Sequence, residues 1–320
     1  MFHTGHKRPR PVGSGLGFTA KSKAAETAMK KQLILVLLAS LAAKVGFASA
    51  RPHNPSAGGD GAQRVNIFNS EGNDPRERVD VTREQALRPI VQIPGSTAFL
   101  VSPCYALAAY HGVFGSHKPR DPLPTITVRV PDIAEDGSLS FKAIEATPAL
   151  WGEGYRQNAI REDWALLRLS VCEGARVGWM ELLPHEANLG GTPIAMAGYP
   201  NDKSRASLWQ DRTGSIHQEG VGVLKDCLLN SAATRGGSSG SPIYQRNTRN
   251  PVVVGMQVRV RNEYPGIIAA YDGRQANIAL DIRPIYRRIE ALIVADMQAF
   301  WAEIPERAGI NPAHPLPGRL

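Results

Sequence analysis

Short apolar runs, separated by Gly, Pro, Asp and Asn, make up most of the chain after about residue 90. Residues 125–130 alternate between polar and apolar side chains, which is typical of a strand with one exposed face. Residues 99–103, 107–110, 192–198 and 252–258 are further strand candidates. Many short strands with turn signals between them predict an all-β fold with closed or stacked sheets.

One long segment has helical periodicity instead. Residues 282–303 repeat apolar side chains at intervals of three and four, which predicts a C-terminal helix with one buried face. That face consists of Ile285, Ile289, Leu292, Ile293, Met297 and Phe300. Arg283, Arg287 and Arg288 lie in the same segment, and we expect them on its solvated side.

Residues 1–50 read as an N-terminal extension followed by a signal peptide. Met29 opens a short basic region, residues 33–43 are apolar, and Ala48-Ser49-Ala50 supplies a cleavage site of small residues. The apolar run is too short to span a membrane. We therefore expect a start at Met29 and cleavage after Ala50. This predicts a secreted or periplasmic protein with no membrane partner once the signal is removed.

The remaining chain divides by composition into three parts. Residues 51–85 are polar and resemble a leader or propeptide, residues 86–305 form one folded domain, and residues 306–320 are a Pro-rich tail. Residues 1–50 carry a net charge of +7 out of the formal +8 of the whole chain, so the mature chain is near +1. This balance predicts no nucleic-acid partner.

The chain has three cysteines, Cys104, Cys172 and Cys227. An odd number leaves at least one thiol unpaired or bridged to another molecule, and an exported protein allows one internal disulfide. The sequence alone does not choose among the pairings. The cysteine spacing does not match a structural zinc site and no carboxylate cluster suggests calcium, so we expect no metal and no cofactor.

Three separated fragments carry the candidate chemistry. Residues 236–242 form a tight Gly- and Ser-rich loop that runs directly into an apolar strand, unlike a flexible linker. His111 ends an apolar run, and Asp163 opens another. A serine hydroxyl becomes a good nucleophile only when a base takes its proton, and the base needs a carboxylate to hold its tautomer. The chain supplies all three groups in the order His, Asp, Ser.

Residues 109–111, 163–167 and 237–242 resemble the three active-site motifs of chymotrypsin-like (trypsin-fold) serine proteases. The form of the serine motif, together with Ala-Gly-Tyr-Pro at 197–200, is most similar to the bacterial glutamyl-endopeptidase-like secreted branch. The resemblance covers roughly residues 90–290. It implies a monomeric serine endopeptidase that acts on protein or peptide substrates.

The resemblance also implies an architecture and a set of roles. The fold would be two antiparallel six-stranded β-barrels with the cleft between them, and the C-terminal helix would pack outside the second barrel. His111 would be the general base and acid, Asp163 its orienting carboxylate, and Ser239 the nucleophile. The backbone N–H groups of Gly237 and Ser239 would form the oxyanion hole.

The pocket for the side chain before the cut bond is implied at Ala233, Thr234, Gln257 and Val258. Ala233 stands where trypsin has an acidic residue, so cleavage after Lys or Arg is not supported. Thr234 matches glutamyl endopeptidases, but Gln257 replaces their histidine. Arg235 or Arg259 could supply a cation for an acidic side chain instead, and the preferred residue stays open.

Activation is also open. Residues 88–91, Arg-Pro-Ile-Val, superficially offer the amino terminus that trypsin-like zymogens expose, but the residue beside the nucleophile is Ser238, which has no carboxylate to receive it.

Two alternative functions remain. Residues 236–240 also fit the nucleophile elbow of α/β-hydrolases, with Ser238 attacking, but the only histidine after Ser238 is His314 in the Pro-rich tail. The other alternative is a catalytically silent protease-fold binding module. Such a module usually lacks a member of the triad, and here all three are present.

Overall fold

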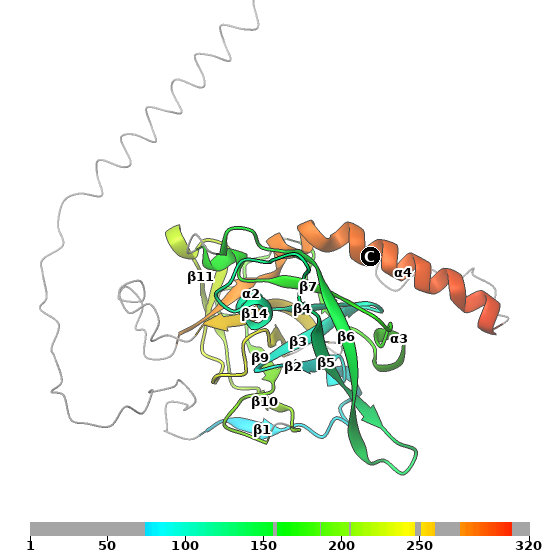
Figure 1. Ribbon diagram of the computed structural model, residues 1–320. Coiled ribbons are helices and arrows are strands. Elements are labelled where there is room, and N and C mark those ends of the chain that lie inside the picture. Colours follow the sequence, from blue (N-terminus) through cyan, green and yellow to red (C-terminus); the bar gives the residue numbers. More distant parts are fainter. Residues whose placement is uncertain are drawn as a thin grey trace, which may run out of the picture. The chain divides into compact units, whose positions relative to one another are not determined.

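Two groups of antiparallel strands form the fold, and a long helix lies across them (Figure 1). The computed structural model describes residues 74–155, 159–185, 187–204, 206–246, 251–259 and 276–308, with side chains up to residue 302. All of them belong to one unit that runs from Ala62 to Leu320. The expected signal peptide, the expected leader before residue 74 and the Pro-rich tail after residue 308 lie outside the described residues.

Six strands close into a barrel in the order β2-β3-β4-β7-β6-β5. Their bounds are β2 Ile90–Ile93, β3 Ser96–Ser102, β4 Tyr105–Ala108, β5 Ile126–Ile133, β6 Leu139–Trp151 and β7 Ala165–Leu169. The alternation predicted for residues 125–130 appears in β5, where Ile126, Val128 and Val130 are buried. The turn between β2 and β3 uses Gly95 at a φ of 69°, a value that suits glycine.

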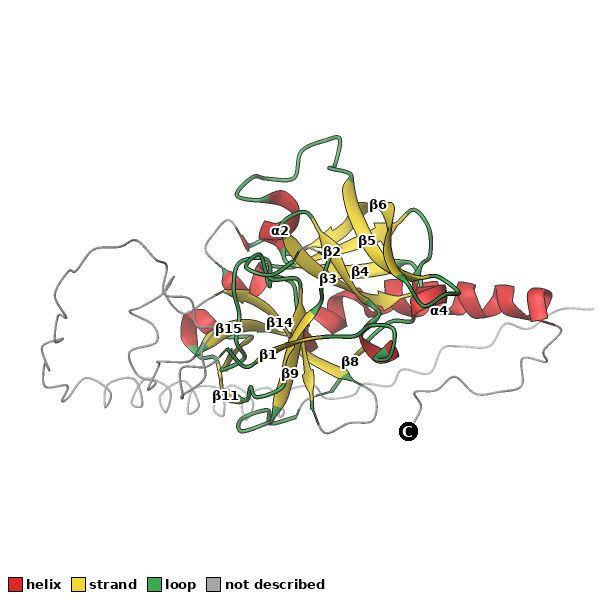
Figure 2. Ribbon diagram, turned by 90° about the horizontal axis from the view of Figure 1, so that it is seen from below, coloured by secondary structure: helices red, strands yellow, loops and turns green. Residues whose placement is uncertain are grey.

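The second group is a nine-stranded sheet in the order β1-β10-β9-β13-β14-β15-β12-β11, with β8 added in parallel beside β14. Figure 2 shows it beside the barrel. The bounds are β1 Arg76–Arg78, β8 Glu181–Leu182, β9 Ile194–Gly198, β10 Trp209–Asp211, β11 Ile216–Glu219, β12 Cys227–Asn230, β13 Pro242–Gln245, β14 Val252–Arg259 and β15 Asn277–Asp281.

Six strands of this sheet, in the order β9-β13-β14-β15-β12-β11, form the expected second half of the fold. Within the described residues its ladder is not closed. A bridge between Pro193 and Ser215, with backbone hydrogen bonds from Ile194 to Gly214 and from Ile216 to Thr192, joins the start of β9 to the start of β11. The sheet therefore curves into a half-barrel. The all-β, chymotrypsin-like fold class is confirmed.

Short helical segments occupy the connections: η1 Gln85–Leu87, α2 Tyr110–Phe114, η3 Ile160–Glu162, α3 Gly174–Val177 and η4 Gly222–Leu224. None of the helices in the described part of the chain is long and apolar enough to cross a membrane.

Alternation along the barrel strands produces two cores. Along β3, Ala98 and Leu100 belong to a cluster that fills the barrel, together with side chains of all the other barrel strands. Phe99 and Val101 belong to a second cluster, which continues into β9, β12, β14 and β15. Because successive side chains of a strand point to opposite faces, one strand serves both cores and fixes the barrel against the sheet.

Helix α4, Ile282–Ala308, contacts β14 and β8 of the sheet and β3 of the barrel. Ile285, Ile289 and Ile293 are at most 3% exposed, as predicted. Leu292 is 37% exposed, so its place on the buried face was wrong. The helix touches both halves of the fold, whereas we expected contact with the second barrel alone.

Arg283 also departs from expectation. It is only 8% exposed, so it does not lie on the solvated side of α4. Its guanidinium binds the carboxylate of Asp281, with Nη2–Oδ2 at 2.6 Å, and reaches Glu219 Oε1 at 2.9 Å. These carboxylates allow a charged group to be buried at the start of the helix.

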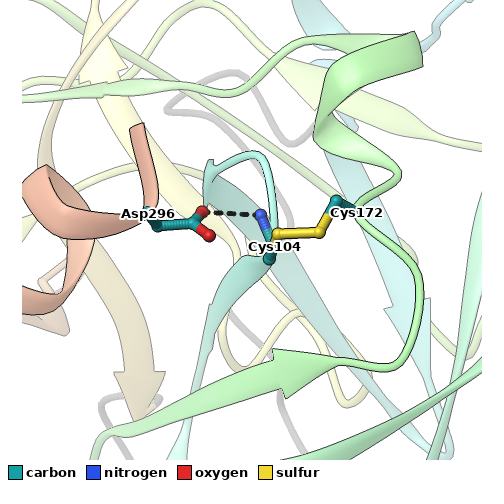
Figure 3. A group of neighbouring side chains, drawn as sticks. All are labelled: Cys104, Cys172 and Asp296. Atoms are coloured by element: carbon teal, nitrogen blue, oxygen red, sulfur yellow. Dashed lines mark hydrogen bonds between the residues drawn. A yellow bond between two sulfur atoms is a disulfide. The ribbon is translucent and has the colours of Figure 1, made fainter. Parts of the chain in front are cut away.

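The structure pairs Cys104 with Cys172 and leaves Cys227 buried as a free thiol. Asp296 of α4 lies beside the disulfide (Figure 3), where one carboxylate oxygen accepts from the Cys104 N–H at 2.8 Å and from Ser102 Oγ at 2.6 Å. Since both sulfur atoms are used by the disulfide, these residues do not form a metal-ligand set. They attach α4 to the turn between β3 and β4.

Residues 74–85, which we expected in a separate leader, lie within the folded unit. Strand β1 pairs with β10 in the register Arg76↔Asp211, Glu77↔Gln210 and Arg78↔Trp209. Val79 and Val81 are buried in the shared core.

Candidate active site

The imidazole of His111 is bound to the carboxylate of Asp163. Nδ1 lies 2.7 Å from Oδ2, and the backbone N–H of His111 donates to Oδ1 at 2.9 Å. The Asp163 side chain is fully buried, while that of His111 is 22% exposed. A carboxylate accepts hydrogen bonds, so it places the ring proton on Nδ1 and leaves Nε2 as a basic nitrogen.

Strand pairing explains why these two residues meet. Strands β4 and β7 are antiparallel with Ala108 opposite Ala165, so the end of one lies beside the start of the other. His111 follows β4 in the first turn of α2, and Asp163 precedes β7. Residues 52 positions apart in sequence therefore reach the same rim of the barrel.

Helix α4 supports the Asp163 segment from the side. Arg288 donates to Glu162 at 2.7 Å, and its guanidinium carbon lies 4.6 Å from the centroid of the Trp164 ring. Both contacts flank Asp163 in sequence. The Arg288 side chain is 40% exposed, so it is partly solvated, as expected, but it also braces the carboxylate-bearing turn.

Two further side chains next to the His111–Asp163 pair were not predicted there. The ring of Tyr155 is stacked beside His111 at 6.5 Å between centroids. Arg259 binds the Tyr155 hydroxyl, and its Nη2 lies 3.9 Å from Asp163 Oδ2. The sequence suggests Arg259 only as a cation for an acidic side chain of the substrate. Its position depends on the approach of β14 to the barrel, for which the sequence carries no local signal.

Ser239 lies in the loop between β12 and β13, and β3 of the barrel holds this loop. The carbonyl of Ser239 accepts from the Thr97 N–H at 2.9 Å and from Ser96 Oγ at 3.1 Å. A Cβ placed on Gly112, the neighbour of His111, would lie 2.7 Å from Ser96 Oγ. Ser96 therefore contacts both the serine loop and the helix that bears His111.

The backbone around Ser239 requires glycine on both sides. Gly237 has a φ of 91° and Gly240 a φ of 82°, values that side-chain-bearing residues rarely adopt. A Cβ on Gly240 would lie 2.0 Å from the Thr97 carbonyl oxygen, and one on Gly237 would lie 2.5 Å from the Tyr199 carbonyl oxygen. The loop fits against the barrel only because both positions are glycine.

The backbone N–H groups of Gly237 and Ser239 are oriented by hydrogen bonds to the carbonyl groups of the same peptide planes, those of Gly236 and Ser238. The Gly236 carbonyl accepts from the Asn201 N–H at 2.7 Å, and the Ser238 carbonyl accepts from the Ser241 N–H at 3.0 Å. In a trans peptide the next residue's N–H points the other way. Among the described residues, the resulting N–H groups of Gly237 and Ser239 have no hydrogen-bond acceptor, so they are available to bind an oxyanion.

The chain matches the family model of the trypsin-like peptidase domain over residues 96–256, half of its length. It belongs to this family. The trypsin-like peptidase is 26% identical over 182 residues to a glutamyl endopeptidase of Bacillus licheniformis, and the match covers 55% of each chain. The chain thus spans about half the length of this curated relative. The predicted family is confirmed, and the similarity to a glutamyl endopeptidase supports the predicted branch.

A solved structure of a Glu endopeptidase in complex with MPD has the same fold. The TM-score is 0.53 at 21% sequence identity, and the match covers 71% of the present chain and 98% of the other. At this identity the likeness extends to the fold alone. It agrees with the barrel and half-barrel described above.

The two serines of the loop between β12 and β13, Ser238 and Ser239, differ in solvent exposure. Ser238 is 2% exposed, and its Oγ faces the Arg235 N–H at 3.5 Å. Ser239 is partly exposed and stands between the two glycines of positive φ. Of the two serines, Ser239 is the more exposed.

The four residues of the expected specificity pocket are all buried. Ala233 and Thr234 follow β12, and Gln257 and Val258 lie on β14. The Gln257 side chain accepts from Asn230 at 3.4 Å and donates to the Arg259 carbonyl at 2.7 Å. The amide group that replaces the expected histidine is therefore held by its neighbours.

Proposed function

We propose that this trypsin-like peptidase is a serine endopeptidase that cuts peptide bonds through an acyl-enzyme on Ser239. The observation that carries the proposal is the His111–Asp163 pair, with Nδ1 2.7 Å from Oδ2. This pair leaves Nε2 free to act as a base. The family supports a peptide or protein substrate.

Ser239 Oγ attacks the carbonyl carbon of the scissile bond, and its proton passes to Nε2 of His111. Asp163 stabilises the imidazolium while the N–H groups of Gly237 and Ser239 hold the oxyanion. The C–N bond breaks as His111 gives its proton to the leaving amine. Water then attacks the acyl group in the same way and returns the Ser239 hydroxyl.

A serine-reactive fluorophosphonate probe tests this reaction. We expect the purified chain to be labelled, and the labelling to be lost in Ser239→Ala but retained in Ser238→Ala, since the Ser238 hydroxyl is buried. Loss in Ser238→Ala alone would instead support the esterase alternative. A folded wild-type chain that does not react would support the binding module and refute the proposal.

We also propose that the peptidase is exported to the cell exterior or periplasm and acts as a monomer. The signal-like residues 29–50 and the Cys104–Cys172 disulfide support export, because disulfides form in oxidising compartments. Cell fractionation tests this directly. Recovery of the protein only from the cytoplasm, with both cysteines reduced, would contradict export.

A further inference from the structure

Arg76 is a buried cation on the edge strand β1, and its side chain is 3% exposed. Its guanidinium binds two carboxylates, each through two nitrogen–oxygen contacts. Nε and Nη2 reach Asp74 at 2.9 Å each, and Nη1 and Nη2 reach Asp202 at 3.1 and 2.6 Å. Lys203 adds a contact to Asp74 at 3.0 Å. Two cations and two carboxylates thus balance at this point.

This arrangement lowers the pKa of both carboxylates. The hydrogen bonds from Arg76 hold the pKa of Asp74 well below its usual range. Partial burial acts to raise the pKa of Asp202, but the hydrogen bond and charge of Arg76 outweigh it and lower that pKa. Both groups stay ionised at neutral pH, so the ion pairs are fully formed there.

Asp202 is adjacent to the residue that orients an oxyanion donor. The preceding residue, Asn201, gives its N–H to the Gly236 carbonyl at 2.7 Å, and this bond aims the N–H of Gly237. Asn201 also packs closely on the loop, because its Oδ1 lies 2.6 Å from the place of a Gly237 Cβ. Movement of Asp202 would be transmitted to that N–H through a single residue.

We propose that Arg76 and Asp202 are positioning residues for the oxyanion loop, so that strand β1 is a working part of the active peptidase and not a removable leader. The inference rests on the proposed function. It places any removal of an N-terminal segment before Arg76, since a cut after this residue would take away the guanidinium that holds Asp202.

The test compares Arg76→Gln and Asp202→Asn with Arg78→Gln, which changes an exposed arginine of the same strand. Active sites are counted with the fluorophosphonate probe, and kcat, KM and the affinity for a peptide boronic acid are measured per active site. Complete loss of an oxyanion donor lowers turnover by ~10²–10³, so a misplaced donor should lower kcat by roughly 10- to 100-fold. We expect KM to change little and boronate affinity to fall in parallel with kcat.

Three results would confirm the role. Arg76→Lys should restore part of kcat, the double variant should be no worse than the poorer single variant, and Arg78→Gln should match the wild type. Unchanged kcat per active site in both test variants, with only a lower melting temperature, would overturn the inference and leave the proposed function standing. A wild-type chain that the probe does not label would overturn both. If Arg76→Gln does not fold, Asp202→Asn carries the same test.

Discussion

Thr97 offers a sharp test of how the barrel holds the serine loop. Its side chain is fully buried, and its hydroxyl makes two hydrogen bonds. Oγ1 accepts from the Tyr199 N–H at 2.9 Å and donates to the Gly237 carbonyl at 2.8 Å. Thr97→Val keeps the shape of the side chain but removes both bonds.

The expected loss of stability follows from these two bonds. Each buried polar group left without a partner costs about 1–3 kcal/mol, so the free energy of unfolding should fall by about 2–6 kcal/mol in Thr97→Val. Thr97→Ser is the matched control, because it keeps the hydroxyl and loses only a methyl group. That change should cost about 1 kcal/mol, the value of one buried carbon group.

Urea unfolding followed by fluorescence measures both values. A Ser239→Ala background prevents self-digestion during the measurement. A second readout is kcat in the active background. It should fall in Thr97→Val because the Gly237 carbonyl loses its hydrogen bond, and the backbone that carries the proposed oxyanion donors is then held less firmly. The reasoning is refuted if Thr97→Val loses no more stability than Thr97→Ser.

Four further outcomes are expected. Asp163→Asn should lower kcat by ~10⁴ in a folded protein, because an amide no longer holds the ring proton on Nδ1, and ester hydrolysis checks this. Ser241→Ala should leave the unfolding free energy unchanged or slightly higher in a urea titration, since the buried Oγ has no partner among the described residues. Cys104→Ser opens a crosslink between positions 68 residues apart and should cost about 4 kcal/mol by chain entropy, a loss that reduction of the wild type should reproduce. The pKa values of Asp74 and Asp202 are lowered in the folded state, so both carboxylates stabilise the fold above their unfolded pKa of about 4. This stability is lost as pH falls through the folded pKa values, and acid unfolding should therefore begin below pH ~4. A melting temperature unchanged by acid would contradict this.

The sequence predicted the local parts of this fold well. The alternation in β5 and the three-and-four spacing in α4 gave strand and helix because each depends on neighbouring residues. The order of His111, Asp163 and Ser239 pointed to the family that the domain match confirms. Their catalytic roles stay a prediction until the labelling experiment is done.

Features that depend on distant partners were missed. Arg76 lies in a polar stretch that read as a solvated leader, because its partner Asp202 is 126 positions away. The burial of Arg283 likewise depends on Glu219, 64 positions away. Leu292 fitted the helical pattern, but periodicity alone does not show where a buried face ends.

The burial of Cys227 matters for a protein that also contains a disulfide. Burial, reinforced by the nearby negative charges of Asp226 and Asp281, raises the pKa of its thiol to about 12. Exchange with a disulfide requires the thiolate, which this side chain almost never forms at neutral pH. Once β12 has paired with β15, the third sulfur can neither reshuffle the existing bridge nor crosslink two copies. An odd cysteine count is therefore harmless to the finished molecule, and its hazard is confined to the interval before these two strands meet.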